Sequence, residues 1–186
     1  MKRALEYVAI IAVAILVALA IQSWLLKPYR IPSESMLDTL RPGDRVLVNR
    51  VVYHLRDPHR GDVIVFHYPE DPSVVFIKRV VGVPGDKLEV KDGRLYLNGR
   101  RVAEPYVHRT AGRLDPTVAQ SAIAGSTLHD PWSLAAPFRV PAGQYFVMGD
   151  NRTDSDDSRD WGTVPRTAIV GEGLATYWPF SRLRAL

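Results

Sequence analysis

Two serines separated by one residue lie shortly after a long apolar segment. They are Ser33 and Ser35, and Pro32 precedes them. The fixed φ of a proline could orient one hydroxyl for nucleophilic attack and the other to donate a hydrogen bond. The same arrangement is common in linkers and helix caps, so a catalytic interpretation also needs a base.

One lysine interrupts an otherwise apolar, β-branched segment at residues 74–83. Burial of Lys78 in such a strand would disfavour its charged form and lower its pKa. An amine that is neutral near pH 7 can act as a general base. The alternative is that Phe76, Lys78 and Val80 share one face and the ammonium reaches water along its flexible stem. Taken alone, the sequence of this strand favours the solvated ammonium over the general base.

The sequence lacks the residues that several other kinds of catalytic or binding site require. The chain has no cysteine, which excludes a disulfide scaffold, a thiol nucleophile and cysteine-ligated zinc. Its five histidines show no ligand spacing, and the five aspartates of residues 150–160 lack the glycine and final glutamate of a calcium loop. No phosphate loop or Gly-x-Ser-x-Gly elbow is present. We therefore expect no metal and no cofactor.

Length and charge narrow the class of protein. The 186 residues are 46% hydrophobic, which suits one globular domain with an additional anchor. The formal charge of +4 would suit nucleic acid or an anionic membrane surface. Because the arginines are scattered and no aromatic platform accompanies them, we expect no nucleic-acid partner.

The N-terminal segment predicts a membrane anchor. Residues 7–26 are twenty consecutive uncharged residues, which as a helix would be about 30 Å long, the thickness of a hydrocarbon core. Lys2 and Arg3 precede the segment, and Lys27 and Arg30 follow it. Because positive residues lie on both sides, the distribution of charge does not by itself fix the orientation of the segment.

A cleaved secretory signal is the alternative for the same segment. Ala18 and Ala20 would provide a small-x-small cleavage site. The apolar run continues to Leu26, which a short signal does not need, so we favour a retained anchor. We predict an N-terminal transmembrane anchor at residues 1–28 and an extracytoplasmic domain at residues 29–186.

The remainder has the alternation and turn dipeptides of β-structure. Asp92-Gly93 and Asn98-Gly99 divide residues 87–102 into a three-stranded meander. Small and polar residues dominate residues 110–137, which predicts a flexible surface insertion. Further strands are predicted at residues 45–53, 62–68, 74–83, 140–148 and 168–178.

Four ordered segments resemble the motifs of the bacterial type I signal peptidases, or leader peptidases. Residues 31–40 resemble the nucleophile motif, and residues 60–66 the strand motif that follows it. Residues 76–86 resemble the lysine motif, and residues 149–162 the last motif. The resemblance spans nearly the whole chain. It implies a mostly β fold, with an antiparallel catalytic domain behind one N-terminal transmembrane helix.

The resemblance also implies a serine endopeptidase with a Ser–Lys dyad. Ser35 would be the nucleophile and Lys78 the general base, so that no histidine is required. The hydroxyl of Ser33 and the backbone N–H of Ser35 would stabilise the oxyanion.

Three residues of the last motif would support this dyad. Ser155 would orient the amine of Lys78, and Asp157 would pair with Arg159 to hold the loop against the site. Two positions depart from the family pattern. Asp38 replaces a common proline and would raise the pKa of the lysine if it pointed inward, and Thr153 replaces a usual aspartate.

The implied substrates are secretory preproteins, cut after small-x-small sequences on the outer face of the bacterial cytoplasmic membrane. The enzyme would be single-pass with a cytoplasmic N-terminus, would contact the lipid bilayer and would act as a monomer. The shallow apolar subsites for the small residues would be lined by Ile31, Pro32, Met36, Leu40, Phe76 and Ile77.

Two other functions fit parts of the sequence. A catalytically silent, membrane-tethered β domain would carry a charged Lys78 far from Ser35. A self-cleaving transcriptional repressor also uses serine and lysine on a β fold, but it needs a helical DNA-binding domain where this chain has its apolar segment.

Overall fold

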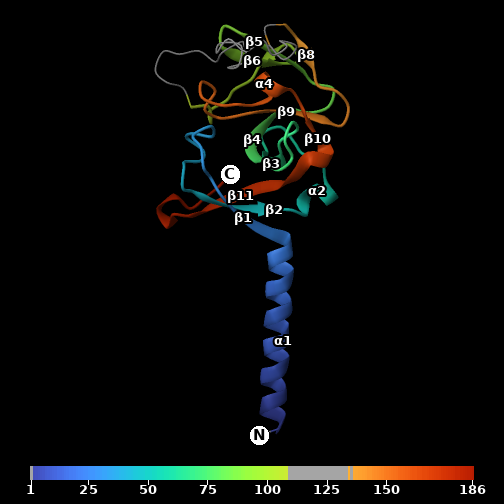
Figure 1. Cartoon of the computed structure of the whole chain (residues 1–186), viewed down its shortest axis with the longest axis vertical. Helices are drawn as coiled ribbons and strands as arrows, with labels where there is room; N and C mark the ends of the chain where they lie inside the picture. The colour runs from blue at the N-terminus through green and yellow to red at the C-terminus, as the bar shows by residue number, and fades with distance from the viewer. Residues whose placement is uncertain (1, 109–133, 135) are drawn as a thin grey trace.

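A long N-terminal helix leads directly into a β domain (Figure 1). The computed structural model of the chain describes residues 2–108, 134 and 136–186. Helix α1 (Lys2–Leu25) extends away from the domain, and strand β1 (Leu26–Arg30) follows it without a break. Residues 26–28, which we assigned to the anchor, therefore form part of a sheet, in which β1 pairs with β2.

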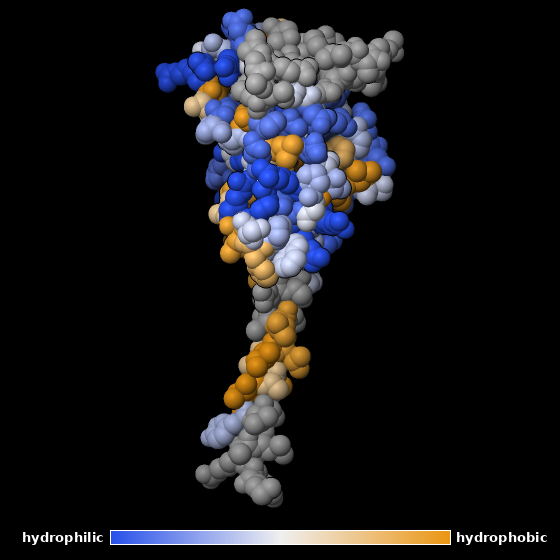
Figure 2. Space-filling model, turned by 90° about the vertical axis from the view of Figure 1, so that its left-hand side faces the viewer, coloured by the Kyte–Doolittle hydropathy of each residue, from blue (hydrophilic) through white to orange (hydrophobic). Residues whose placement is uncertain are grey.

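The predicted N-terminal helix is present, and its described side chains are mostly hydrophobic. In Figure 2 the coloured residues of this helix are mostly hydrophobic, and the coloured face of the domain above it is largely hydrophilic. Within the described part of the chain, however, no helix has both the length and the apolar character needed to cross a membrane. The transmembrane anchor therefore stays a prediction.

The main sheet is antiparallel and carries most of the domain. Its strands follow the order β1-β2-β11-β3-β4-β9-β10, and β12 pairs with β11 at one side. The strands after β1 are β2 (Arg45–Asn49), β3 (Val63–His67), β4 (Val75–Gly82), β9 (Gln144–Met148), β10 (Val164–Pro165), β11 (Ile169–Trp178) and β12 (Arg184–Ala185).

A smaller antiparallel sheet has the strand order β7-β6-β5-β8. Its strands are β5 (Lys87–Lys91), β6 (Arg94–Leu97), β7 (Arg100–Arg101) and β8 (Phe138–Arg139). The predicted meander is confirmed. Its first turn has positive φ at both central residues, 48° at Asp92 and 63° at Gly93, as a tight two-residue hairpin requires.

All five of the strands predicted outside the meander are shorter in the structure, and two of them, β2 and β9, are shorter by four residues. Strand β2 ends at Asn49 because the Asn49 side chain accepts hydrogen bonds from the N–H groups of Val51 and Val52, at 2.9 and 3.1 Å. This turn starts helix α2 (Val52–Leu55). Strand β9 starts only at Gln144 because its N–H closes a turn onto the carbonyl of Pro141. The pattern did not predict helix α4 (Ser158–Trp161) or the short 3-10 helices η1 (Arg166–Ala168) and η2 (Phe180–Arg182).

Clusters of buried apolar side chains pack on the main sheet and hold its strands and loops together. One cluster packs Met36 and Leu40, from the loop after β1, against Val46, Val48 and Val63. Most of the predicted insertion at residues 110–137 lies outside the described residues. Leu134, near the end of that range, is fully buried in a second cluster, and its carbonyl accepts the N–H of Val90 at 2.7 Å.

Candidate active site

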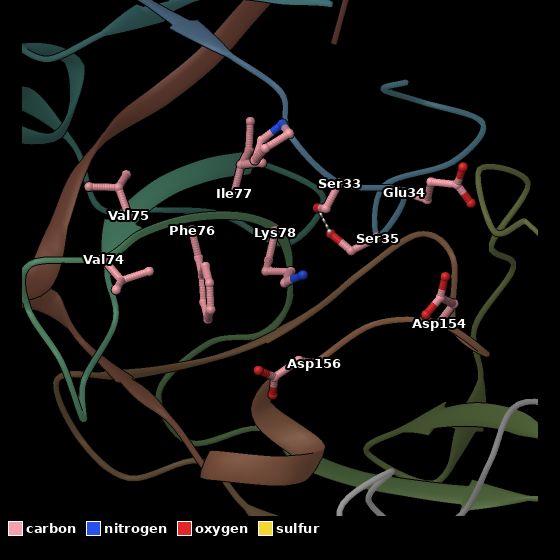
Figure 3. A pocket seen from close by; sticks show the side chains of 11 residues that line it. Ser33, Glu34, Ser35, Val74, Val75, Phe76, Ile77, Lys78, Asp154 and Asp156 are labelled. Atoms are coloured by element: carbon pink, nitrogen blue, oxygen red, sulfur yellow. Dashed lines mark hydrogen bonds between the residues drawn. The ribbon is translucent and has the colours of Figure 1, made fainter. Parts of the chain in front are cut away.

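A pocket of about 380 Å³ opens where three parts of the chain meet (Figure 3). These parts are the loop after β1, the start of β4 and the loop before α4. The lining residues are Pro32, Ser33, Glu34, Ser35, Val74, Val75, Phe76, Ile77, Lys78, Asp154 and Asp156. Both predicted catalytic residues are therefore in one pocket, although 43 positions separate them in the sequence (78 − 35).

The two serines lie in a turn that the loop after β9 holds in place. Their Oγ atoms are 3.3 Å apart. The carbonyl of Ser35 accepts the N–H of Asn151 at 3.0 Å, and the carbonyl of Glu34 accepts the Asn151 side-chain amide at 3.2 Å. Only 8% of Ser35 is exposed. Its hydroxyl is therefore held at the wall of the pocket and is not free to move with a flexible linker.

Lys78 lies on β4, in the interior of the main sheet, opposite Ile64 of β3. Only 4% of it is exposed, so the alternative in which its ammonium reaches bulk water is wrong. Burial lowers the pKa of the amine, whereas the charges of Asp157 and Asp156 act in the opposite direction. Lys78 Nζ lies 5.6 Å from the centre of the Phe76 ring.

Figure 3 shows the Lys78 amine facing the same space as the Ser33 and Ser35 hydroxyls. Among the described residues, Lys78 Nζ makes no hydrogen bond or ion pair, including none to Ser35 Oγ. Catalytic hydrogen bonds are often long in an unliganded enzyme and shorten when substrate binds. The arrangement therefore provides a desolvated amine and a hydroxyl in one cavity.

Asp157 and Arg159, which we expected to pair, form a buried ion pair with Nε–Oδ1 at 2.8 Å and Nη2–Oδ2 at 2.9 Å. Asp157 also caps α4 and accepts the N–H of Gly149 at 2.9 Å. Burial acts to raise the pKa of Asp157, but the Arg159 guanidinium and these hydrogen bonds hold it below its usual value. The last motif is thereby fixed to the end of β9.

Ser155 does not hold the amine of Lys78 in this structure. Its hydroxyl is buried, and it has no hydrogen-bond partner among the described residues. A buried hydroxyl without a partner is costly, so it is available to a group that enters or moves within the site. The orienting role that we predicted for Ser155 stays a prediction.

A second buried ion pair connects the serine loop to the lysine strand. Arg79, which follows Lys78, donates to both carboxylate oxygens of Asp150, at 2.8 and 2.7 Å. The hydroxyl of Thr39 donates to the same carboxylate at 2.5 Å. Breaking such a pair would leave an uncompensated buried charge. Asp150 therefore helps to hold the two catalytic segments together.

Three of the six predicted subsite residues line the pocket, and three do not. Pro32, Phe76 and Ile77 are lining residues. The others lie in the core, because the loop after β1 turns its large apolar side chains inward, onto the sheet. These are Ile31, Met36 and Leu40, with 2%, 0% and 0% exposure. Val74 and Val75 line the pocket instead, and they belong to the same apolar run as Phe76.

Asp38 does not act on the lysine. Its side chain is 64% exposed, forms a hydrogen-bonded pair with His108 at 2.9 Å and lies 3.8 Å from Arg41. The hydrogen bond from His108 lowers the pKa of Asp38. The acidic residues near Lys78 are Asp156, Asp157 and Asp160, in the loop before α4 and in that helix. Within the described ranges, no group of three metal-ligating side chains forms.

Gly149, the first residue of the last motif, packs closely against Ser35 and Ser155. A Cβ at this position would overlap the carbonyl oxygen of Ser35 and the hydroxyl of Ser155. We expect Gly149→Ala to destabilise the protein by about 1–3 kcal/mol and to reduce catalysis by displacing Ser35. Thermal melting and cleavage assays measure the two effects.

Gly173→Ala is the matched control for this substitution. Its new Cβ would meet the flexible end of Leu186 at 3.1 Å, which can move aside. Equal melting temperatures and equal activities for the two variants would contradict the prediction.

Comparisons with known proteins show the family of this chain. The family described as "Signal peptidase, peptidase S26" matches residues 4–178. An antiparallel β domain that joins serines and a buried lysine in one pocket is thus the domain of a peptidase, and the chain belongs to the peptidase S26 family. Its enzymatic class is signal peptidase I.

Curated relatives match almost the whole chain. A signal peptidase I of Leptolyngbya laminosa is 38% identical over 98% of this chain and 83% of the relative. Signal peptidase I T of Bacillus subtilis is 36% identical over 97% of this chain and 88% of the relative. A crystal structure of a signal peptidase I from Enterococcus faecalis is 31% identical, with a TM-score of 0.45, and the match covers 63% of this chain and 97% of that chain.

Proposed function

We propose that this enzyme is a membrane-bound serine endopeptidase that removes N-terminal signal peptides from secreted preproteins after small-x-small sites. Ser35 is the nucleophile and Lys78 the general base. The observation that carries the proposal is the burial of the Lys78 amine in the pocket that both serine hydroxyls line. A desolvated amine is easier to deprotonate, and a neutral amine can take the proton of a hydroxyl.

The reaction has two halves. Lys78 takes the proton of the Ser35 hydroxyl while the Ser35 oxygen attacks the carbonyl carbon of the scissile peptide bond. The Ser33 hydroxyl and the backbone N–H of Ser35 stabilise the resulting oxyanion. The lysine ammonium then gives its proton to the leaving amine, and an ester on Ser35 remains. Water, deprotonated by the same amine, hydrolyses the ester and restores the hydroxyl.

The loop before α4 supports this dyad. The Asp157–Arg159 pair holds the loop, and the Ser155 hydroxyl, which has no hydrogen-bond partner among the described residues, is available to become a partner of the lysine. An N–H of the neutral amine, donated to the Ser155 hydroxyl oxygen, would leave the lone pair of the amine directed toward Ser35.

The selection of small residues follows from the shape of the apolar wall. Pro32, Phe76 and Ile77 form part of this wall, with Val74 and Val75 beside them. Such a wall rejects a large side chain by steric overlap more than it attracts a methyl group. The precursor binds extended, as an added strand next to the pocket.

The bacterial cytoplasmic membrane is the site of action, with the N-terminus in the cytoplasm and the β domain outside it. Helix α1 supports this proposal, since Ile10, Leu16 and Leu19 are 56–65% exposed. A row of exposed apolar side chains needs a lipid or protein cover. Anchoring raises the effective concentration of precursors held in the same bilayer.

A model precursor tests the proposed function. The full chain in detergent should release one signal peptide, cut directly after a small-x-small sequence, as mass spectrometry of both products would show. Replacing the alanine at position −1 by leucine should reduce kcat/KM by at least about 100-fold, because the pocket cannot enlarge without disturbing packed strands. Equal cleavage of the two precursors, or cleavage at unrelated positions, would refute the proposal.

A further inference from the structure

The pocket has two chemically different ends on either side of the proposed dyad. Figure 3 shows Val74 and Val75 on one side of Lys78, and Glu34 and Asp154 on the other side, beyond the serines. We define the acidic end as Glu34 and Asp154. Both side chains are exposed, and neither forms an ion pair within the described residues. Their charges are therefore available to a bound ligand.

The rest of the pocket does not neutralise this end. Lys78 is the only basic side chain among the described lining residues, and it is 4% exposed, directed into the cavity and without a hydrogen bond or ion pair there. The amine faces the open space of the pocket, where an atom of a bound peptide can approach it. Asp156, also a lining residue, adds a third carboxylate. A peptide that passes Lys78 therefore enters a negative field.

We infer that the acidic end binds the first residues after the scissile bond and selects precursors with a basic side chain there over precursors with an acidic one. The inference rests on the proposed function, which places the small residues before the scissile bond against the apolar wall. The chain that follows the bond must then leave past Glu34 and Asp154. The new α-amine released by cleavage, which is protonated below its ordinary pKa of about 8, forms beside the same carboxylates.

The effect acts through exposed charges, so its size is moderate and depends on salt. An exposed ion pair changes an equilibrium by a few-fold, and salt screens it over a distance of about 10 Å at 0.1 M. For two carboxylates we expect kcat/KM for a lysine-containing peptide to exceed that for its glutamate counterpart by about five- to tenfold at low salt.

Three peptides test the inference with the full-length enzyme in detergent at pH 8. They share a small-x-small site and carry lysine, glutamine or glutamate at the second position after the scissile bond. The wild-type enzyme should prefer lysine over glutamate, and about 0.5 M NaCl should largely remove the preference. Equal kcat/KM values for the three peptides at low salt would overturn the inference.

The double variant Glu34→Gln/Asp154→Asn assigns the effect to the acidic end. The lysine-to-glutamate ratio should fall to about one. Asp92→Asn, in the turn between β5 and β6, removes one carboxylate that does not line the pocket and should keep the ratio.

The outcomes separate the inference from the proposed function. Cleavage of all three peptides without charge preference would refute the inference about the acidic end and leave the proposed function standing. A preference that survives in the double variant would also refute it. Failure of the wild-type enzyme to cut any of the peptides would refute the proposed function and this inference together.

Discussion

Ser35→Ala should abolish precursor cleavage, with a loss of at least about 10⁴-fold in kcat. Ser33, whose Oγ lies 3.3 Å away, is assigned to the oxyanion and not to the attack. Removing the hydroxyl leaves the substrate wall and Lys78 in place, so binding should be nearly unchanged while the acyl-enzyme cannot form.

Ser33→Ala is the matched control for this experiment. Loss of one oxyanion donor costs about 10²–10³-fold, because the backbone N–H of Ser35 remains. Both variants should melt close to the wild type, since each loses one hydroxyl at the pocket wall. Similar losses for Ser33→Ala and Ser35→Ala, or trapping of an acyl-enzyme on the Ser35→Ala variant, would contradict the assignment.

Lys78→Met should reduce kcat by about 10²–10⁴-fold, the usual contribution of a general base. Methionine matches the unbranched stem of lysine and keeps the volume of the buried side chain. Lys78→Arg should be equally inactive, because a guanidinium remains protonated and cannot accept a proton. Lys87→Met, on the exposed start of β5, is the control and should keep full activity.

The pH profile distinguishes a base from a structural lysine. Burial lowers the pKa of Lys78, and only its neutral form accepts a proton from Ser35. The wild-type rate should therefore rise with pH through this lowered pKa, which is below the ordinary 10.5. The residual rate of Lys78→Met should lack this rise. A rise of the same shape in the variant would show that another group titrates.

The same shift has a consequence for stability. Between the lowered pKa of Lys78 in the folded protein and the ordinary value in the unfolded chain, the unfolded state binds more protons. The stability of the wild type should therefore rise with pH in this window and be lower below it. Lys78→Met should melt at a higher temperature than the wild type at low pH, and the difference should shrink as pH rises.

The order of the motifs allowed much of the site to be predicted. The spacing of Ser33 and Ser35 after a proline, and a lysine within a β-branched run, are local features that chemistry requires. The meander could be predicted from its turns, Asp92-Gly93 and Asn98-Gly99, because only a few residue types readily adopt the positive φ that such turns require.

Other parts of the site depend on directions that a local pattern does not contain. Ile31, Met36 and Leu40 have the character of subsite residues, yet the loop turns them into the core. Residues 150–160 contain five aspartates that look equivalent in the sequence. Folding buries Asp157 against Arg159 and leaves Asp154 exposed at the pocket.

By itself, the sequence determined which groups were available: two hydroxyls, one amine in an apolar strand, and the turns that return the chain to one sheet. Only the tertiary structure decided whether that amine loses its water. Lys78 is buried because its strand lies inside the sheet, with β3 on one side and β9 on the other, while the serine loop and the loop before α4 form the pocket around it. Desolvation depends on every element that surrounds a group, and these elements come from distant parts of the chain.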